Sequence, residues 1–486
     1  MPRALLCVAA LAAAADGLSW LLDGFRSDAP SHDATTQAIA LRSALRDAGY
    51  TAPNLRRRLL RGTPAADALL PTALLRRDGG RGAAPAGGDG LDALTALFAL
   101  GLAVDARQLP AACVEAVAPV CVEAGGLLRS RAMLAPVDAR GRDLLVATDW
   151  PPEHGACRAE GEEACMYLGP DSAALADLGA AVAAAAAPKR VVDLCAGSGV
   201  QGLAAAAAGA CAEFKSSNRL QCERTRQFRC NLFGCSSRTR REQSIRPKIS
   251  RIDFDLTELE NSEVWSGPPK PVLNSAQAGA RPTWVEREHR AAAFCRWNAA
   301  ANGAPGDVRV GAVADADAAG GADLVLANPP YVAAPPSANY DAFADGGPDG
   351  YDVVVDCAAF AARALSDDGV FVAVLELNGP ADALFDRVSR AWGDRGGAAA
   401  LLHDAPSART AAAAAADRRA AGDGAWAANY AANGVDHVAN AVLVVKRAPG
   451  GGGLRCAATA VPRGAWAPPP TNGAARAWLA GVLRPK

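Results

Sequence analysis

A strand, a glycine-rich turn and a helix follow one another directly in KRVVDLCAGSGVQGLAAAAAG, residues 189–209. The apolar run at its start lacks the alternation of a half-exposed strand, so it suits a central strand of a parallel sheet. Similar runs stand at 322–326 and 369–377, and helical patterns at 287–302 and 352–365 separate them. This order of strands and helices predicts a doubly wound α/β domain.

The N-terminal part of the chain has a different pattern. ALRSALRDAGY and LDALTALFALG place apolar residues at helical spacing and stop near Gly49 and Gly101, and a third helix is expected at 111–123. Residues 132–149, AMLAPVDARGRDLLVATD, indicate two strands around a turn. After residues 1–34, the chain divides into three parts: a smaller, mostly helical α+β domain at 35–165, the α/β domain at 166–450 and a C-terminal tail at 451–486.

Residues 1–34 are assigned to a targeting or disordered segment. Arg3 precedes an apolar run at 4–15 that ends in small residues, a pattern that resembles a secretory signal or the front of an organelle presequence. An alanine-rich helix of a cytosolic protein is the alternative. The run is too short to span a bilayer, and no later segment has the apolar length of a membrane helix, so no membrane partner is expected.

One internal segment departs from the composition of the rest. Residues 214–275 contain no alanine, although alanine is the commonest residue of the chain. We place an anomalous insertion at 213–282, where an α/β fold normally has a short connection. It is either a surface insertion, which loop-closure entropy tolerates, or translated non-coding sequence such as a retained intron. The sharp change in composition favours the second interpretation, and no function is assigned to the segment.

Charge and cysteine usage limit the classes of partner. The net charge is −1 and the isoelectric point is about 6.5, so no global basic field draws the chain to nucleic acid, although a local basic patch stays open. The thirteen cysteines form no C-x-x-C pair. One cluster has spacings that match no usual zinc site: Cys211, Cys222, Cys230 and Cys235. No metal is expected, and reduced thiols indicate an intracellular protein, cytoplasmic or organellar.

The glycine-rich turn, Gly197 to Gly202, matches G-x-G-x-x-G and fits either a dinucleotide or the nucleoside part of S-adenosylmethionine. An ordinary strand-to-helix turn is the alternative. Asp193 stands four residues before Gly197, at the end of the strand. A carboxylate there would repel a pyrophosphate but would attract the cationic methionine moiety, so the residue favours S-adenosylmethionine.

Recognition of a ribose needs a second carboxylate at the end of the next strand. Glu286 is the preferred candidate, because it follows a short strand and precedes a helix. Glu213 lies at a suitable distance but runs into the anomalous segment, and Glu288 is the second choice beside Glu286. The alternative for Glu286 is a solvated charge at a helix start.

The strand at 322–327 ends abruptly in Asn328, Pro329, Pro330 and Tyr331. The prolines fix the backbone, so the Asn328 side-chain oxygen and a proline carbonyl present two acceptors at a fixed separation. Two such acceptors suit the hydrogens of a planar NH2 group, and Tyr331 can stack on the plane that carries it. An electrophilic methyl group opposite the nitrogen then allows transfer by positioning. The alternative is a Pro-Pro loop that merely ends a strand.

VVDLCAGSG together with LANPPYV resembles the class I S-adenosylmethionine-dependent methyltransferases of the small-domain type. These include the release-factor glutamine methyltransferases, the guanine-N2 rRNA enzymes and the adenine-N6 enzymes. The resemblance implies that the N-P-P-Y motif, Asn328 to Tyr331, grips the target nitrogen. It also implies a set of cofactor-binding residues: Asp193, Cys195, Gly197, Ser198, Gly199, Glu286 and Ala312. FADGGPDGYDVV, residues 343–354, resembles the loop that follows the motif in bacterial members.

Two departures accompany this resemblance. Cys195 replaces the first glycine of the commonest motif, and Ala312 stands where many members have an acid for the adenine amine, so Asp315 or the backbone would make that contact. The expected activity is methyl transfer to a protein glutamine amide or to an exocyclic amine of RNA or DNA, with the translation machinery as one expected partner. The alternatives are an NAD-dependent oxidoreductase and a catalytically degenerate binding module. Neither Tyr331 nor Tyr351 has the lysine four residues on that an oxidoreductase would use.

Overall fold

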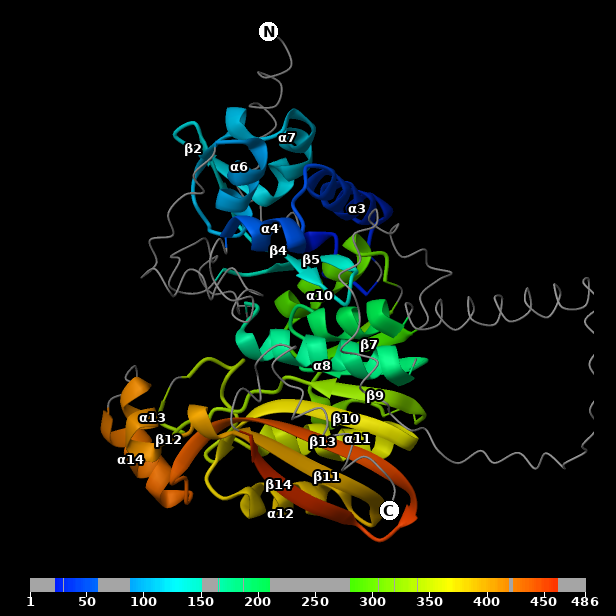
Figure 1. Ribbon diagram of the computed structural model, residues 1–486, viewed down its shortest axis with the longest axis vertical. Coiled ribbons are helices and arrows are strands. Elements are labelled where there is room, and N and C mark those ends of the chain that lie inside the picture. Colours follow the sequence, from blue (N-terminus) through cyan, green and yellow to red (C-terminus); the bar gives the residue numbers. More distant parts are fainter. Residues whose placement is uncertain are drawn as a thin grey trace, which may run out of the picture.

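The computed structural model describes residues 22–28, 30–59, 88–150, 165, 167–186, 188–209, 280–304, 306–318, 320–338, 340–418 and 423–461. The N-terminal helices lie at one end of its long axis and a large sheet lies towards the other end (Figure 1). The four cysteines between 211 and 235, Glu213 and the segment 214–275 lie outside the described residues.

The N-terminal domain combines short helices with two small antiparallel sheets. Its helices are α3 (His32–Asp47), α4 (Ala52–Leu59), α6 (Gly90–Phe98), α7 (Ala111–Val117) and the 3-10 turns η2 (Ala106–Gln108) and η3 (Ala118–Val120). One sheet has the order β1-β3-β2 and the other is a hairpin. Their strands are β1 (Val104–Asp105), β2 (Cys121–Ala124), β3 (Leu127–Ser130), β4 (Met133–Asp138) and β5 (Asp143–Thr148). The predicted hairpin is confirmed.

Two boundaries of this domain differ from the prediction. The helix expected at 111–123 ends at Val117, because Pro119 has no N–H with which to continue it; the chain passes through η3 into β2. The segment assigned to 1–34 reaches too far, since Leu22 and Phe25 are each 1 % exposed and pack in the same core as α3.

The second domain is built on a nine-stranded sheet with the order β14-β11-β13-β10-β9-β6-β7-β8, to which β12 adds beside β13. Its strands are β6 (Arg190–Leu194), β7 (Arg281–Glu286), β8 (Asp307–Val310), β9 (Ala322–Ala327), β10 (Leu365–Asn378), β11 (Arg395–Asp404), β12 (Arg409–Thr410), β13 (His437–Gly451) and β14 (Leu454–Val461). Counted from β6, the first five strands take the order 3-2-1-4-5 of a Rossmann sheet and are parallel. The predicted fold class is confirmed.

Two further strands near the end of the chain extend the sheet. The strand β13 runs between β10 and β11 and is antiparallel to both. The strand β14 falls in the region assigned to a C-terminal tail, and it pairs in parallel with β11 to form the edge. The sheet domain therefore continues to at least Val461.

Helices cover both faces of the sheet, as Figure 1 shows. The side chains of Val191, Leu324 and Leu326 share a core with α8 (Pro170–Ala186) and with the helix at 200–209. The alternate residues of the same strands pack in a second core with two helices, α11 (Asp352–Ala364) and α12 (Ala381–Trp392). The remaining elements are η6 (Val313–Asp315), η7 (Ala405–Ser407), α13 (Ala411–Asp417) and α14 (Asp423–Ala432).

One helix, α10 (His289–Ala301), belongs to both domains, because its residues pack in the N-terminal core and in the core of the sheet. Asn302 exchanges hydrogen bonds with the backbone of Leu145 at 3.0 and 2.7 Å, and Asn298 does the same with Ala147 at 2.6 and 2.9 Å. These two amides therefore pair with the outer edge of β5 as a neighbouring strand would. The amide of Asn298 also donates to the carbonyl of Ser198, at 2.8 Å.

Candidate functional site

The candidate site lies at the carboxyl ends of β6 and β9. These two strands are neighbours although they are not consecutive, so the strand order reverses between them. In doubly wound sheets, ligands bind in the crevice outside the strand ends at such a reversal.

The glycine-rich turn after β6 is built from left-handed backbone conformations, with φ of 52° at Cys195, 53° at Gly197 and 75° at Gly199. A Cβ atom on Gly199 would lie 2.5 Å from the sulfur of Cys295, whereas one on Gly197 would meet nothing within 4 Å. Gly199 is thus required by packing, and Gly197 leaves open space beside the turn. The cysteine that departs from the family pattern occupies a conformation that glycine adopts without strain.

Asp193 lies beneath this turn and is fully buried. Its Oδ2 accepts a hydrogen bond from the N–H of Gly202 at 2.8 Å, while its Oδ1 is buried and has no partner among the described residues. Burial, and then the nearby charge of Glu286, raises the pKa of Asp193 well above its usual value, and the Gly202 N–H opposes that shift. The carboxylate therefore gains from a positive charge beside its free oxygen.

Glu286 is the last residue of β7 and points to the same turn. Its Oε2 accepts from the N–H of Gly197 at 2.7 Å, and its Oε1 accepts from the N–H of Glu288 at 3.0 Å. Glu288 instead pairs with Arg287 at 2.7 Å and precedes α10. The structure therefore brings Glu286, and not Glu288, into hydrogen-bonding contact with the glycine-rich turn.

The two other residues of the expected cofactor set border this region. Ser198 is buried in the turn, and its carbonyl accepts from Asn298. Ala312 follows β8, and the N–H of the preceding Gly311 donates to the carbonyl of Glu286 at 3.0 Å. This bond holds Ala312 at the carboxyl end of the sheet, beside Glu286.

Asn328 follows β9 directly. Its amide nitrogen donates to Oδ2 of Asp171 at 2.9 Å and to the hydroxyl of Ser172 at 3.2 Å. Its oxygen, Oδ1, is buried and lacks a partner within the described ranges. Tyr331 donates from its hydroxyl to the same Asp171 oxygen at 3.3 Å. The motif thus offers an unused acceptor at the carboxyl end of β9.

The loop expected to follow the motif packs on it. The N–H of Val332 donates to the carbonyl of Ala344 and the N–H of Gly346 donates to the carbonyl of Val332, both at 2.9 Å. A Cβ on Gly346 would lie 2.8 Å from the Cα of Tyr331. In addition, the side chain of Asn378, at the end of β10, donates to the carbonyl of Tyr331 at 3.2 Å. The backbone of the motif is therefore held from two sides.

The two residues that carry the unused acceptors stand at the ends of neighbouring strands. Asp193 pairs with Leu326 in the register of β6 and β9, and Asn328 follows Leu326 by two positions. Partners in a parallel register and residues two apart share a face of the sheet, so Asp193 and Asn328 both face the layer of α8. From strand spacing and rise, their Cα atoms are roughly 8 Å apart, a separation that one small ligand spans.

Asp171 and Ser172 were not predicted from the sequence; they are 2 % and 5 % exposed in the first turn of α8. The sequence signals only a helix start here, with Pro170 followed by an acidic residue. Nothing local connects this turn with Asn328, because the two segments are 157 positions apart.

A further polar network lies behind Tyr331. Glu376 on β10 pairs with Arg418 and, at 3.3 Å, with Arg409, and Arg418 also donates to the hydroxyl of Tyr430 at 2.7 Å. The ring of Tyr331 packs against the apolar cluster around α13 and α14. Arg409 and Arg418 are thus already paired with groups of the chain itself.

The arginine-rich helix α4 is also engaged in ion pairs. Arg58 pairs with Asp89 at 2.5 Å and with Asp92, and Arg56 lies 3.6 Å from Asp138.

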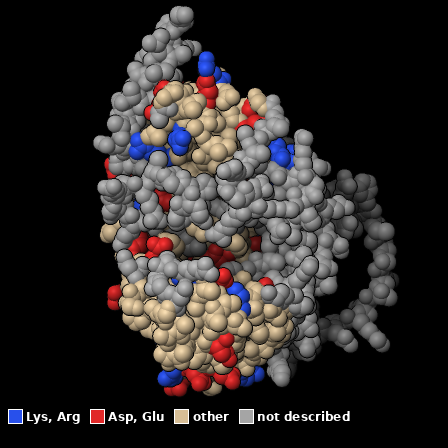
Figure 2. Space-filling view, turned by 90° about the vertical axis from the view of Figure 1, so that its left-hand side faces the viewer, with Lys and Arg blue, Asp and Glu red and all other residues tan. Residues whose placement is uncertain are grey.

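On the face that Figure 2 shows, Asp and Glu side chains gather at a hollow at mid-height of the molecule. Among the described residues, no group of three His, Cys, Asp or Glu is arranged to hold a metal ion, and none of the helices combines the length and apolarity needed to cross a membrane.

Comparisons with known proteins bear on the fold. No protein-family model matches the chain, and no curated protein matches it. Solved structures do: a SAM-dependent methyltransferase from Agrobacterium tumefaciens is 12 % identical, with a TM-score of 0.33 and coverage of 68 % of this chain and 77 % of that one. A structure described as a methyltransferase complexed with SAH is 13 % identical, with a TM-score of 0.32 and coverage of 67 % and 57 %.

A [4+2]-cyclase is matched as well, at 11 % identity and a TM-score of 0.27, over 61 % of this chain and 90 % of that one.

Proposed function

We propose that the chain is an S-adenosylmethionine-dependent N-methyltransferase that acts on a planar NH2 group. The observation that carries the proposal is that Asn328 and Asp193, at the ends of neighbouring strands where the strand order reverses, each keep a buried, unused Oδ1. An unpaired buried acceptor costs free energy unless a ligand supplies a donor or a positive charge. The Asp193 oxygen suits the end of a methyl-transfer site that binds the cofactor, and the Asn328 oxygen suits the end that binds the target nitrogen.

The residues around the turn fit the cofactor. Asp193 would attract the ammonium of the methionine moiety, directly or through water, and Glu286 would accept from the ribose hydroxyls with the oxygens that now accept from Gly197 and Glu288. The open space at Gly197 allows a ligand to approach the backbone. When bound, S-adenosylmethionine supplies an electrophilic methyl group on its sulfonium.

The residues after β9 would hold the acceptor. Asn328 Oδ1 and a carbonyl of Pro329 or Pro330 accept the two N–H groups, and Tyr331 stacks on the plane of the amide or base. This turns the nitrogen lone pair towards the methyl group, and the nitrogen releases a proton once it becomes cationic. This pair of acceptors selects an NH2 group over a hydroxyl. A protein glutamine and an exocyclic amine of RNA or DNA both satisfy it, and the translation machinery is the proposed partner for a protein or RNA target.

Isothermal titration calorimetry with S-adenosylmethionine and, separately, with NAD tests the proposal. We expect the first to bind and the second not to. Binding of NAD instead would identify an oxidoreductase, and binding of neither would identify a degenerate module. The purified chain and tritiated S-adenosylmethionine are then added to protein and RNA extracted from cells that lack the chain. Mass spectrometry of the labelled fraction identifies the methylated group.

Replacing Asp193 tests the cofactor end of the site. In Asp193→Asn, the amide oxygen can still accept from Gly202, but the negative charge is lost, so we expect the Kd for S-adenosylmethionine to rise about tenfold. Asp193→Ala loses the Gly202 bond too and should bind more weakly still. Calorimetry measures both, and a thermal melt of each variant reports whether it is folded. Wild-type affinity in folded Asp193→Asn would contradict the placement.

A further inference from the structure

We propose that Asp171 is a positioning residue that sets the orientation of the Asn328 amide, an inference that rests on the proposed function. Its Oδ2 accepts from the Asn328 nitrogen at 2.9 Å and from the Tyr331 hydroxyl at 3.3 Å. It is 2 % exposed, so water does not compete strongly for these bonds. One buried carboxylate oxygen thus contacts both polar side chains of the target motif.

The chemistry of a carboxylate decides which end of the amide faces it. An ionised carboxylate only accepts hydrogen bonds, whereas an amide has a donor end and an acceptor end of almost the same shape. With the nitrogen of Asn328 held by Asp171, the oxygen must face the other way, where it is buried and unused. A flipped amide would set its oxygen against the carboxylate and would present a second donor to an NH2 group.

Ser172 alone cannot determine which end of the Asn328 amide faces α8. Its hydroxyl accepts the second amide hydrogen of Asn328 at 3.2 Å, but a hydroxyl donates as readily as it accepts. It would therefore bond to either end of the amide. The discrimination comes from the neighbouring carboxylate.

The fold holds Asp171 firmly in place. A Cβ atom on Gly179 of α8 would lie 2.8 Å from a methyl group of Leu326, so this helix lies close against β9. Asp171 stands in its first turn, where the helix dipole favours a negative charge. Because the carboxylate draws on the amide N–H, it also polarises the amide and makes Oδ1 a better acceptor.

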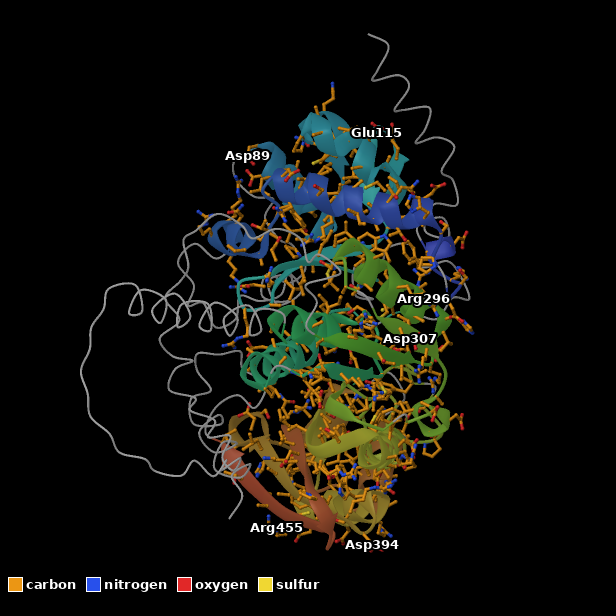
Figure 3. The ribbon with its side chains drawn as sticks, turned by 90° about the vertical axis from the view of Figure 1, so that its right-hand side faces the viewer. Asp89, Glu115, Arg296, Asp307, Asp394 and Arg455 are labelled. Carbon is orange, nitrogen blue, oxygen red and sulfur yellow. The ribbon has the colours of Figure 1, made fainter. Side chains whose placement is uncertain are left out.

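The test compares Asp171→Asn with the wild-type chain in the tritium assay described above. An asparagine at 171 can present oxygen or nitrogen, so Asn328 no longer has one preferred orientation. We expect kcat to fall about 30-fold, the effect of losing a hydrogen bond to a charged group, while the Kd for S-adenosylmethionine stays within twofold. Ser172→Ala should lower kcat less than threefold, and Asp307→Asn, an exposed carboxylate on β8 (Figure 3), should leave it unchanged.

A reciprocal exchange separates positioning from folding. In Asp171→Asn with Asn328→Asp, the amide at 171 donates to the carboxylate at 328, whose second oxygen faces the target as an acceptor again. We expect this double variant to exceed both single variants in kcat, which a merely structural role for Asp171 does not predict. Wild-type kcat in Asp171→Asn, or a double variant no better than the singles, overturns the inference while the proposed function stands. A wild-type chain that neither binds the donor nor transfers label overturns both.

Discussion

Asn328→Ala is expected to lower kcat by about 100- to 1,000-fold and to leave the Kd for S-adenosylmethionine within twofold. The substitution removes the acceptor oxygen that would hold the target nitrogen in line with the methyl group, and loss of one preorganised hydrogen-bonding group costs about this much in other active sites. It leaves Asp193 and the glycine-rich turn intact, so the donor end of the site is unaffected. Tritium transfer and calorimetry measure the two quantities on the same preparation.

Asn54→Ala is a matched control, because Asn54 lies on α4 of the N-terminal domain and its amide donates to the carbonyl of Gly49, not to the motif. We expect it to behave as the wild-type chain does. If Asn328→Ala turned over normally, the role given to the motif would be wrong. If it lost donor affinity as well, Asn328 would belong to the cofactor end of the site.

Asp149→Ala is expected to destabilise the protein by about 3–5 kcal/mol, the usual cost of leaving one member of a buried ion pair without its partner. Asp149 follows β5, and its carboxylate binds Arg290 of α10 through two hydrogen bonds of 2.8 and 2.6 Å. Both side chains are 6 % exposed. The same carboxylate accepts from the N–H of Cys165 at 2.8 Å, so its loss removes that hydrogen bond too. Denaturant unfolding measures the change in the free energy of unfolding.

The double variant Asp149→Leu with Arg290→Met is the control, because it removes both charges where Asp149→Ala removes only one. Apolar side chains of similar size often replace a buried pair at little cost, so we expect the double variant to be at least 2 kcal/mol more stable than Asp149→Ala. Equal stability of the two variants would mean that the ion pair matters through its shape and not its charge. A loss below 1 kcal/mol in Asp149→Ala would contradict the cost expected for breaking this buried ion pair.

The sequence predicted where three residues of the candidate site stand in the fold, because their positions follow directly from strand ends. Asp193, Glu286 and Asn328 each stand at or just after the end of an apolar run, and parallel strands bring their carboxyl ends to one edge. The glycines between 197 and 202 mark the turn by themselves. For these residues, local pattern and the rules of parallel sheets were enough.

Other features could not be predicted because long-range contacts determine them. Asp171 meets Asn328 only through the packing of α8 on β9, which the alanine-rich sequence of that helix does not encode as a readable pattern. The position of β13 inside the sheet depends on β11 and β14, neither of which has a strong strand pattern in its glycine- and alanine-rich sequence. The apolar sequence of β13 is typical of a strand that is buried on both faces, which agrees with its place between β10 and β11.

The amide pair on α10 has a consequence for how the chain can be divided. Asn298 and Asn302 occupy the backbone groups of Leu145 and Ala147 that would otherwise form an open strand edge. A fragment cut between the hairpin and α10 would expose this edge and invite pairing between copies. The complementary fragment would leave Asn298 and Asn302 without the strand edge with which they pair. We therefore expect that insolubility of the separated halves would be a property of the cut and not of the fold.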